Sequence, residues 1–363
     1  MAMNNLKRFL YGPASVPANA SRLHLTKASS LLDSDAKVGF EIDSVTGVLV
    51  NTLFDESKIV YDFNYCTTNV DISGNAIIPT LSYFTQCIEK YGPFNAILDI
   101  GCGQGEFVEA LRNRGLNCTG FDPVLIQASD YLKNKFWTQE EDPADLFVMR
   151  CVLPHLADPW KFLESIWLNS PNALVLVEYQ RIEWIAENSI FSQISHDHVQ
   201  QFVLNDFEEH VEVVDHGLFA EGEWQWVLIK KNSLSKDKKP DRNDARETYM
   251  EALENDRSII VEGVKSLIKE GKNIAIWGAG SKGAIFADHL LQQGVSEFSV
   301  VDSDTKKEGR YLEKSGIRVC SPAVFSKDTE VYMIIVMNPR HIEYVQSNIQ
   351  STHKVVTLKQ LAS

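Results

Sequence analysis

Two histidines flank an aspartate in the polar stretch "SQISHDHVQQF". His196 and His198 are two residues apart, so they would share one face of a strand and would diverge on a helix. On a strand they could form a metal pair, but the neighbouring sequence offers no evident third ligand. We favour an imidazole whose pKa lies near neutrality, which is oriented by the carboxylate of Asp197 and removes a proton as a general base. Exposed histidines of a polar loop are the remaining alternative.

A glycine-rich turn in "ILDIGCGQGEFVEAL" is the second group of candidate residues. Gly101, Gly103 and Gly105 allow a ligand to approach the backbone between a strand and the N-terminus of a helix. Asp99 precedes the turn. Asp122 ends the next strand, 21 residues after Gly101, where an acid can accept both hydroxyls of a ribose. The spacing fits either a dinucleotide or S-adenosylmethionine.

A second glycine turn occurs far downstream, in "IAIWGAGSKGAIFADHL". Gly278, Gly280 and Gly283 again lie between a strand and a helix, and Asp302 ends the following strand 24 residues after Gly278. This spacing could form an NAD site. Alternatively, Lys282 and the backbone N–H groups of the helix N-terminus could bind a pyrophosphate.

The elements that must position these residues alternate between strands and helices. After the helix "IIPTLSYFTQCIEKY", the strands "NAILDIG", "NCTGFDP", "DLFVMRCV" and "NALVLVEY" are separated by amphipathic segments such as "DPWKFLESIWLN". This alternation predicts an α/β fold with a parallel, doubly wound sheet. The hydrophilic stretch "KKNSLSKDKKPDRNDARE" interrupts the pattern, which then resumes around the second glycine turn.

We therefore expect four parts along the chain. Residues 1–75 contain short apolar runs broken by Gly, Pro, Asn and Asp, which indicates a small β-containing lobe. Residues 76–232 form the first α/β unit, residues 233–272 form a linker and a long helix, and residues 273–363 form a second, Rossmann-like unit.

Composition narrows the classes of partner. A net charge of −14 argues against a general nucleic-acid or anionic-membrane partner, and no apolar run approaches the roughly 20 residues that span a bilayer. The six cysteines are scattered singly, without a CxxC pair. These observations predict a cytoplasmic protein, a monomer or homodimer, that has reduced thiols and no bound metal.

The stretches "LDIGCGQGEF", "GFDP" and "DLFVMRCVLPHLADPWKFL" resemble the class I S-adenosylmethionine-dependent methyltransferase pattern over about 80 residues. The resemblance implies that S-adenosylmethionine is the cofactor. It also implies that the cofactor binds at Asp99, Gly101, Gly103, Gly105 and Asp122.

The stretch "LVLVEYQRIEWIAENSIFSQISHDHVQQF" resembles the sugar C-methyltransferase family, in which a strand ending in Glu is followed by a "YHEH"-type motif. That family methylates a carbon beside the ketone of a nucleotide-linked 4-keto-deoxysugar. The motif's final His corresponds to His198, its acid to Asp197, its first His to His196 and its Tyr to Ser195. The family's second active-site tyrosine corresponds most closely to Tyr65. The resemblance implies that His198 is the base and that Asp197 orients or polarises it.

The stretches "WGAGSKGAIF", "VVDSDTKKEGRYL" and "IIVMNPRHI" resemble the C-terminal domain of the same family, which is associated with holding the nucleotide sugar. This implies a substrate-binding role for Gly278, Gly280, Lys282 and Asn338, together with Glu178 at the end of its strand. The resemblance extends from about residue 50 to the C-terminus. The family's paired zinc-binding cysteines are absent from the N-terminal lobe, so a metal-free lobe is expected.

The leading hypothesis is a C-methyltransferase that enolises a nucleotide-linked keto sugar. Ser195 cannot supply a phenol to an enolate, which leaves O- or N-methylation of a related sugar as a second hypothesis. Two further hypotheses stay open at this point, namely a non-catalytic nucleotide-sugar binding protein and an NAD-dependent oxidoreductase built on the second glycine turn.

Overall fold

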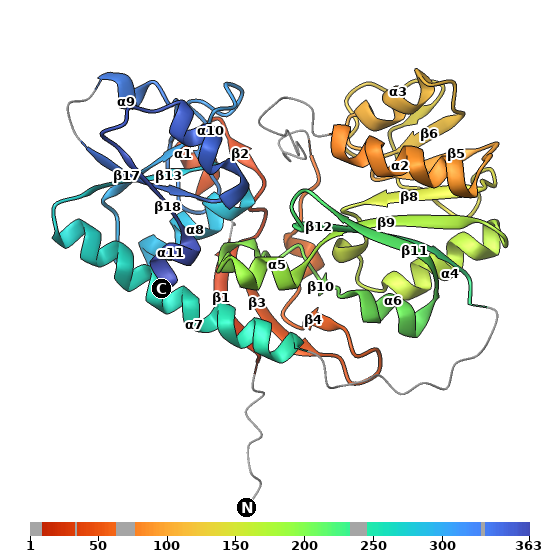
Figure 1. Cartoon of the computed structure of the whole chain (residues 1–363), viewed down its shortest axis with the longest axis horizontal. Helices are drawn as coiled ribbons and strands as arrows, with labels where there is room; N and C mark the ends of the chain where they lie inside the picture. Colours follow the sequence, from red (N-terminus) through yellow and green to blue (C-terminus); the bar gives the residue numbers. More distant parts are fainter. Residues whose placement is uncertain (1–8, 33–34, 63–76, 233–244, 328–330) are drawn as a thin grey trace, which may run out of the picture.

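Two α/β units lie on either side of a small N-terminal sheet (Figure 1). The computed structural model describes residues 9–32, 35–62, 77–232, 245–327 and 331–363. Within these residues, no helix is both long enough and apolar enough to cross a membrane.

The N-terminal sheet has four strands, and the last comes from a distant part of the chain. Its members are β1 (Tyr11–Pro17), β3 (Asp35–Ile42), β4 (Leu49–Asn51) and β10 (Gln200–Gln201), in that order and antiparallel. The short elements α1 (Lys27–Ser30) and η1 (Glu56–Lys58) accompany them. Because β10 begins two residues after His198, its pairing with β4 anchors the histidine-containing loop to this sheet.

The first α/β unit is built on a seven-stranded sheet. Its strands are β5 (Ile97–Ile100), β6 (Cys118–Phe121), β7 (Leu132–Lys133), β8 (Leu146–Arg150), β9 (Leu174–Gln180), β11 (Glu212–Phe219) and β12 (Trp224–Lys230). They lie in the order β11-β12-β9-β8-β5-β6-β7. The expectation of a parallel sheet is wrong for one strand, because β12 runs antiparallel to both neighbours. Residues 220–223, which join β11 to β12, are too few for a parallel crossover and form a hairpin instead.

Helices cover both faces of this sheet, with α2 (Ile77–Tyr91) and α3 (Glu106–Arg112) on one face and α4 (Pro159–Asn169) and α6 (Leu204–His210) on the other. Side chains of a strand alternate between faces, so Phe147 packs in a core with α4 and α6 while Val148 packs in a core with α2 and α3. The short elements η2 (Leu153–His155), α5 (Ile182–Glu187) and η3 (Phe191–Gln193) follow β8 and β9, and α5 and η3 pack in the core that is shared with the second unit.

The second α/β unit is a five-stranded parallel sheet. Its strands are β13 (Asn273–Trp277), β14 (Phe298–Val301), β16 (Val319–Cys320), β17 (Tyr332–Val336) and β18 (Lys354–Thr357), in the order β16-β14-β13-β17-β18. Its helices are α8 (Ser281–Gln292), α9 (Val324–Lys327), η4 (Pro339–His341), α10 (Ile342–Ser347) and α11 (Leu358–Ala362). This arrangement confirms the predicted second α/β alternation.

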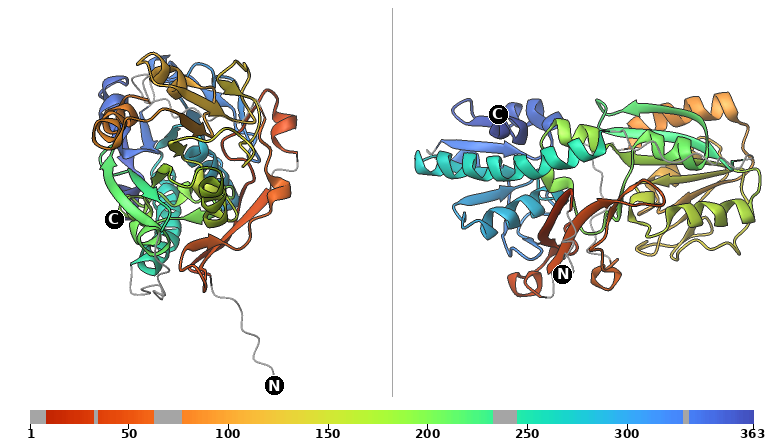
Figure 2. Two further views of the ribbon diagram at one scale, coloured as in Figure 1. Left: turned by 90° about the vertical axis from the view of Figure 1, so that its right-hand side faces the viewer. Right: turned by 90° about the horizontal axis from the view of Figure 1, so that it is seen from below.

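The long helix α7 (Arg246–Lys269) connects the parts. It packs on α11 and β13 of the second unit, on β1 and on α5 of the first unit (Figure 2). A further link is the pairing of β2 (Leu23–His24) with β15 (Tyr311–Leu312). One hydrophobic cluster contains side chains of all three parts, for example Phe40, Ile185 and Ile276. Burial of this shared core holds the N-terminal sheet against both α/β units.

Candidate functional site

The first glycine turn begins where β5 ends. Gly101 has φ +74°, and a Cβ there would lie 2.3 Å from the Cγ2 atom of Val152. The backbone N–H of Gly101 donates to the carbonyl of Phe121 at 2.8 Å. This position therefore requires glycine, for its backbone conformation and for the space that it leaves.

Asp122 holds the turn from the end of β6. Its carboxylate accepts the backbone N–H of Gly103 at 2.8 Å and that of Val124 at 2.9 Å. Burial raises the pKa of this carboxyl, and the two backbone hydrogen bonds oppose the rise. A carboxylate has about four lone-pair sites, so acceptor capacity remains for ribose hydroxyls.

Asp99 is the most unusual residue of this turn. Its side chain is fully buried, and neither carboxylate oxygen has a hydrogen-bond partner among the described residues. Burial raises the pKa of Asp99 to about 7, because the ion pair with Arg150, at 3.8 Å, does not offset the desolvation. A buried carboxylate without a hydrogen-bond partner, beside a glycine turn, fits a ligand that brings its own cation, such as the α-ammonium of S-adenosylmethionine.

Glu178 and Tyr83 are two further buried residues of this charge cluster. Glu178, at the end of β9, accepts a hydrogen bond from Tyr83 and lies close enough to Arg150 for the two charges to interact. Asp99 and Glu178 together present two carboxyls to one guanidinium, an imbalance that a cationic ligand would correct. Glu178 was predicted to bind substrate, and the structure places it in this cluster. Arg150 was missed, although a lone cation at the end of the apolar strand "LFVMR" was a possible signal.

The raised pKa of Asp99 predicts a pH-dependent stability. Between about pH 4 and pH 7 the folded chain binds a proton at Asp99 that the unfolded chain has released, so the free energy of unfolding should fall as pH rises through this window. Asp99→Asn removes the titration. Thermal denaturation without ligand should therefore show the variant gaining stability relative to wild type from pH 5 to pH 8. The exposed Asp130→Asn is the control; a wild-type-to-variant difference that is independent of pH would contradict the account.

The second cluster brings together His155, Asp197 and His198. One potential ligand atom from each lies within 4.8 Å of the others, and the two imidazole rings meet edge to face with centroids 4.8 Å apart. The Nδ1 atom of His155 is 2.8 Å from the carbonyl oxygen of Asp197, which fixes the ring. Ser195 donates its hydroxyl to the Asp197 carboxylate at 2.6 Å. Ser195 therefore orients the acid, whereas the family motif has a phenol at that position.

His198 is a neutral imidazole at physiological pH. Burial, aided by the charges of His155 and Lys282 and opposed by Asp197, lowers its pKa to about 4, which is below the near-neutral value expected from the sequence. A neutral ring can accept a proton, but a low pKa makes it a weak base. The strength of His198 as a base therefore depends on the charges around it.

The same three residues could hold a transition metal ion. Two neutral imidazoles and a carboxylate are common ligands, and the contact from Ser195 is typical of the hydrogen bonds that orient such ligands. The sequence prediction considered His196 and His198 as a metal pair and found no third ligand. In the structure His155 takes the place of His196 beside His198, and it comes from η2 just beyond the carboxyl end of β8, where parallel sheets commonly position functional groups.

His196 lies apart from this cluster. It is buried, and its Nδ1 atom is 2.7 Å from the carbonyl of Lys37 in β3. The backbone N–H of Asp55 donates to its Nε2 atom at 3.2 Å. These contacts tie the loop to the N-terminal sheet and give the ring a structural role. Tyr65, the predicted second tyrosine, lies outside the described residues.

A different tyrosine, Tyr61, lies within electrostatic reach of both clusters. The side chain is 41% exposed, and its partial burial raises the pKa of the phenol, as do the charges of Asp197 and Asp122. One of these acids belongs to the second cluster and the other to the first glycine turn. Tyr61 is therefore near enough to both for their charges to act on it, which the sequence alone did not indicate.

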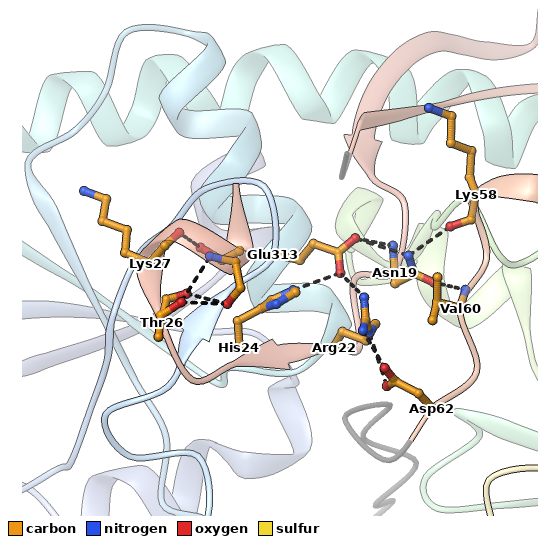
Figure 3. Close-up of polar contacts among 11 residues, drawn as sticks. Asn19, Arg22, His24, Thr26, Lys27, Lys58, Val60, Asp62 and Glu313 are labelled. Carbon is orange, nitrogen blue, oxygen red and sulfur yellow. Dashed lines mark hydrogen bonds and ion pairs between the residues drawn. The ribbon is translucent and has the colours of Figure 1, made fainter. Parts of the chain in front are cut away.

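The backbone around Tyr61 is fixed by a polar network (Figure 3). The side-chain amide of Asn19 donates to the carbonyl of Lys58 at 3.0 Å and accepts the backbone N–H of Val60 at 2.8 Å. Arg22 pairs with Asp62 at 2.6 Å. The buried carboxylate of Glu313 accepts the N–H of Asn19 at 3.0 Å, so the second α/β unit also supports this segment.

The second glycine turn repeats the architecture of the first. Asp302 accepts the N–H of Ala279 at 2.7 Å, as Asp122 accepts that of Gly103, but it also pairs with Lys307 at 3.0 Å. A Cβ at Gly283 would lie 1.8 Å from the carbonyl oxygen of Gly278, so close packing of α8 on the turn requires this glycine.

The predicted substrate ligands next to this turn are engaged by Glu223 from the first unit. Lys282 donates to its carboxylate at 3.0 Å, and the side-chain amide of Asn338 donates at 3.0 and 3.2 Å. Arg340, which sequence reasoning missed, donates at 3.1 Å. Gly280 begins α8 beside them, and a Cβ there would meet open space.

Two family models match the chain. Residues 81–219 match the model described as methyltransferase domain, and residues 233–355 match the model described as C-methyltransferase C-terminal domain. Among proteins with curated functions, no sequence matches the chain significantly.

Solved methyltransferase structures overlap with part of the chain. The mitomycin 7-O-methyltransferase is 17% identical, with a TM-score of 0.33 over 44% of this chain and 56% of its own. Human N-acetylserotonin methyltransferase in complex with SAM is 16% identical, with a TM-score of 0.33 over 44% and 53%. A plantazolicin methyltransferase in complex with a substrate analogue and SAH is 16% identical, with a TM-score of 0.35 over 45% and 88%. The overlaps span about half the length of the first two structures, and we draw no functional conclusion from overlaps of this extent.

Proposed function

We propose that the chain, in which residues 81–219 match a methyltransferase domain and residues 233–355 match a C-methyltransferase C-terminal domain, transfers the methyl group of S-adenosylmethionine to a carbon beside the ketone of a nucleotide-linked keto-deoxysugar. The observation that carries this proposal is the half-buried His198, a neutral imidazole that is grouped with Asp197 and His155 and lies within the field of Lys282 from the second unit. A carbon acid needs a base, whereas the sulfonium methyl needs only an aligned nucleophile.

The donor is held by the first unit. We assign the α-ammonium of S-adenosylmethionine to Asp99, the ribose to Asp122, and the close backbone approach to Gly101, Gly103 and Gly105. When bound, the cofactor supplies an electrophilic methyl group on a good leaving group. The chain's own contribution is to exclude water, to balance the charge of the buried cluster and to hold the acceptor in line.

The proton step belongs to the second cluster. His198 takes the proton from the carbon next to the ketone, and Asp197, held by Ser195, stabilises the resulting imidazolium. His155 fixes the loop through the Asp197 carbonyl. Tyr61, within electrostatic reach of Asp197, is our candidate for the phenol that Ser195 cannot supply to the enolate oxygen, and Tyr65 remains a prediction.

The acceptor is held by residues 273–363. The helix N-terminus at Gly278 and Gly280 and the cations Lys282 and Arg340 can bind a pyrophosphate, and Asn338 adds a neutral donor. We retain the division of the chain into residues 1–75, 76–232, 233–272 and 273–363 as part of this proposal.

Transfer to oxygen or nitrogen is the second candidate function. It is favoured by Ser195, because a hydroxyl or amine nucleophile needs no enolate stabilisation.

The position of the transferred methyl group tests the function. We expect incubation with S-adenosylmethionine labelled with ¹³C in its methyl group and a set of nucleotide-linked 4-keto-deoxysugars to give a product whose labelled methyl couples to a ring carbon in NMR spectra. A methyl on oxygen or nitrogen would replace the leading function by the second candidate, and no transfer to any sugar would contradict both.

A further inference from the structure

The turn between β11 and β12 carries a buried carboxylate, Glu223, that the proposed mechanism does not use. The turn is tightly constrained: Ala220, Glu221 and Gly222 have φ values of 51°, 57° and 81°, all in the left-handed region. Non-glycine residues rarely adopt this conformation, so surrounding contacts must enforce it. The result is that Glu223 is directed toward the second α/β unit.

Glu223 is the centre of a network that crosses between the two units. Its carboxylate accepts hydrogen bonds from Gln180 at 2.7 Å on its own sheet. From the other unit it accepts Lys282 at 3.0 Å, Arg340 at 3.1 Å and the amide of Asn338. Lys282 lies in the first turn of α8, whereas Asn338 and Arg340 lie at η4, so one acceptor from the first unit holds donors from two elements of the second unit together.

The side chains of this network differ in their exposure to solvent. The side chain of Glu223 is 2% exposed, whereas those of Lys282 and Arg340 are 17% and 23% exposed. Two cations share the one buried carboxylate beside the N-terminus of α8, and the exposed carboxylate of Glu221 lies 4.0 Å from Arg340. The cations can therefore reach an anionic ligand from solvent while their other side remains fixed by Glu223.

We propose that Glu223 is a positioning residue: it holds Lys282, Arg340 and Asn338 as one preformed site for the phosphates of the acceptor. The assignment of phosphates rests on the proposed function. The positioning role rests on the hydrogen bonds that Glu223 accepts from these three residues.

The experiment compares Glu223→Gln with wild type in the full chain. We expect KM for the nucleotide sugar to rise about 10-fold, because the donors lose their fixed geometry, while the affinity for S-adenosylmethionine stays within twofold. The kcat should stay within about twofold of wild type, because Glu223 does not touch the reacting groups of the proposed mechanism. Glu297→Gln is the control, since it removes an exposed carboxylate of the second unit outside this network and should leave all values unchanged.

Different outcomes test the positioning role of Glu223 and the proposed function. An unchanged KM in Glu223→Gln, or a fall in kcat as large as the rise in KM, would overturn the positioning role. If Glu223→Gln does not fold, Glu223→Asp keeps the charge with a shorter side chain and should raise KM at unchanged kcat. If wild type transfers no methyl to a nucleotide sugar, calorimetric titration with uridine diphosphate still tests the site: weaker binding by Glu223→Gln than by wild type supports the positioning role, and equal binding contradicts it.

Discussion

Replacement of His198 by asparagine should lower the rate of methyl transfer by about 10²- to 10⁴-fold, the usual cost of losing a general base. Asparagine approximates the size of the ring and keeps a polar side chain, but it cannot accept a proton at neutral pH. Because His198 does not belong to the first glycine turn, the dissociation constant for S-adenosylmethionine should stay within about twofold of wild type. Single-turnover kinetics and calorimetry measure the two effects separately.

The exposed His216 provides the control for this substitution, because His216→Asn removes an imidazole from β11 without touching either cluster. Its kinetics should match wild type. A His198→Asn variant that transfers methyl to carbon at the wild-type rate would show that another group is the base, and Tyr61 would then be examined first.

Substitution of Gly101 by valine should abolish donor binding. The branched side chain would have to adopt φ +74° and would overlap Val152, so the turn cannot keep the conformation that admits the cofactor. We expect the dissociation constant for S-adenosylmethionine to rise by about 100-fold or more, equivalent to about 2.7 kcal/mol. Calorimetry on protein whose fold has been verified by circular dichroism measures this loss.

Two further variants make the Gly101 result interpretable. Gly115→Ala is the control, since Gly115 also has a positive φ but a Cβ there meets nothing within 4 Å. Asp122→Ala removes the carboxylate that accepts the N–H groups of Gly103 and Val124, and it should weaken donor binding in a chain that keeps Gly101. Wild-type affinity in a folded Gly101→Val variant would mean that the donor binds elsewhere.

Much of the architecture could be predicted because it depends on local patterns. The helix predicted from "IIPTLSYFTQCIEKY" is confirmed as α2. The long helix predicted within residues 233–272 is confirmed as α7. Apolar runs between glycine turns gave the parallel strands of both units. These signals come from residues close together in sequence, where periodicity and glycine placement are informative.

The contacts within the site could not be predicted in the same way. His155 meets Asp197 only because η2 and the loop before β10 come together across 42 residues of sequence. Lys282 was predicted to bind phosphate from its place on α8, but its pairing with Glu223, 59 residues away, depends on how the two units pack. Neither contact leaves a periodic or spacing signal.

Asp99 illustrates the same difference between local sequence signals and contacts made by distant parts of the chain. Its place before Gly101 predicts a donor site, because that spacing depends on the strand and the turn alone. Its charge state depends on Arg150 and Glu178, which lie on other strands of the same sheet. Sequence therefore predicts a nucleoside ligand at this turn, and only the fold reveals the electrostatics of Asp99.

Hydrogen exchange at the acceptor tests the central claim most directly, because it isolates the proton step from methyl transfer. The wild-type chain is incubated in heavy water with the nucleotide-linked keto sugar that it methylates and without S-adenosylmethionine. We predict that deuterium enters the carbon beside the ketone, detected by NMR and mass spectrometry, and that His198→Asn stops this exchange. Carbon methylation by wild type without any exchange, or exchange that continues at the same rate in His198→Asn, would contradict enolisation by His198.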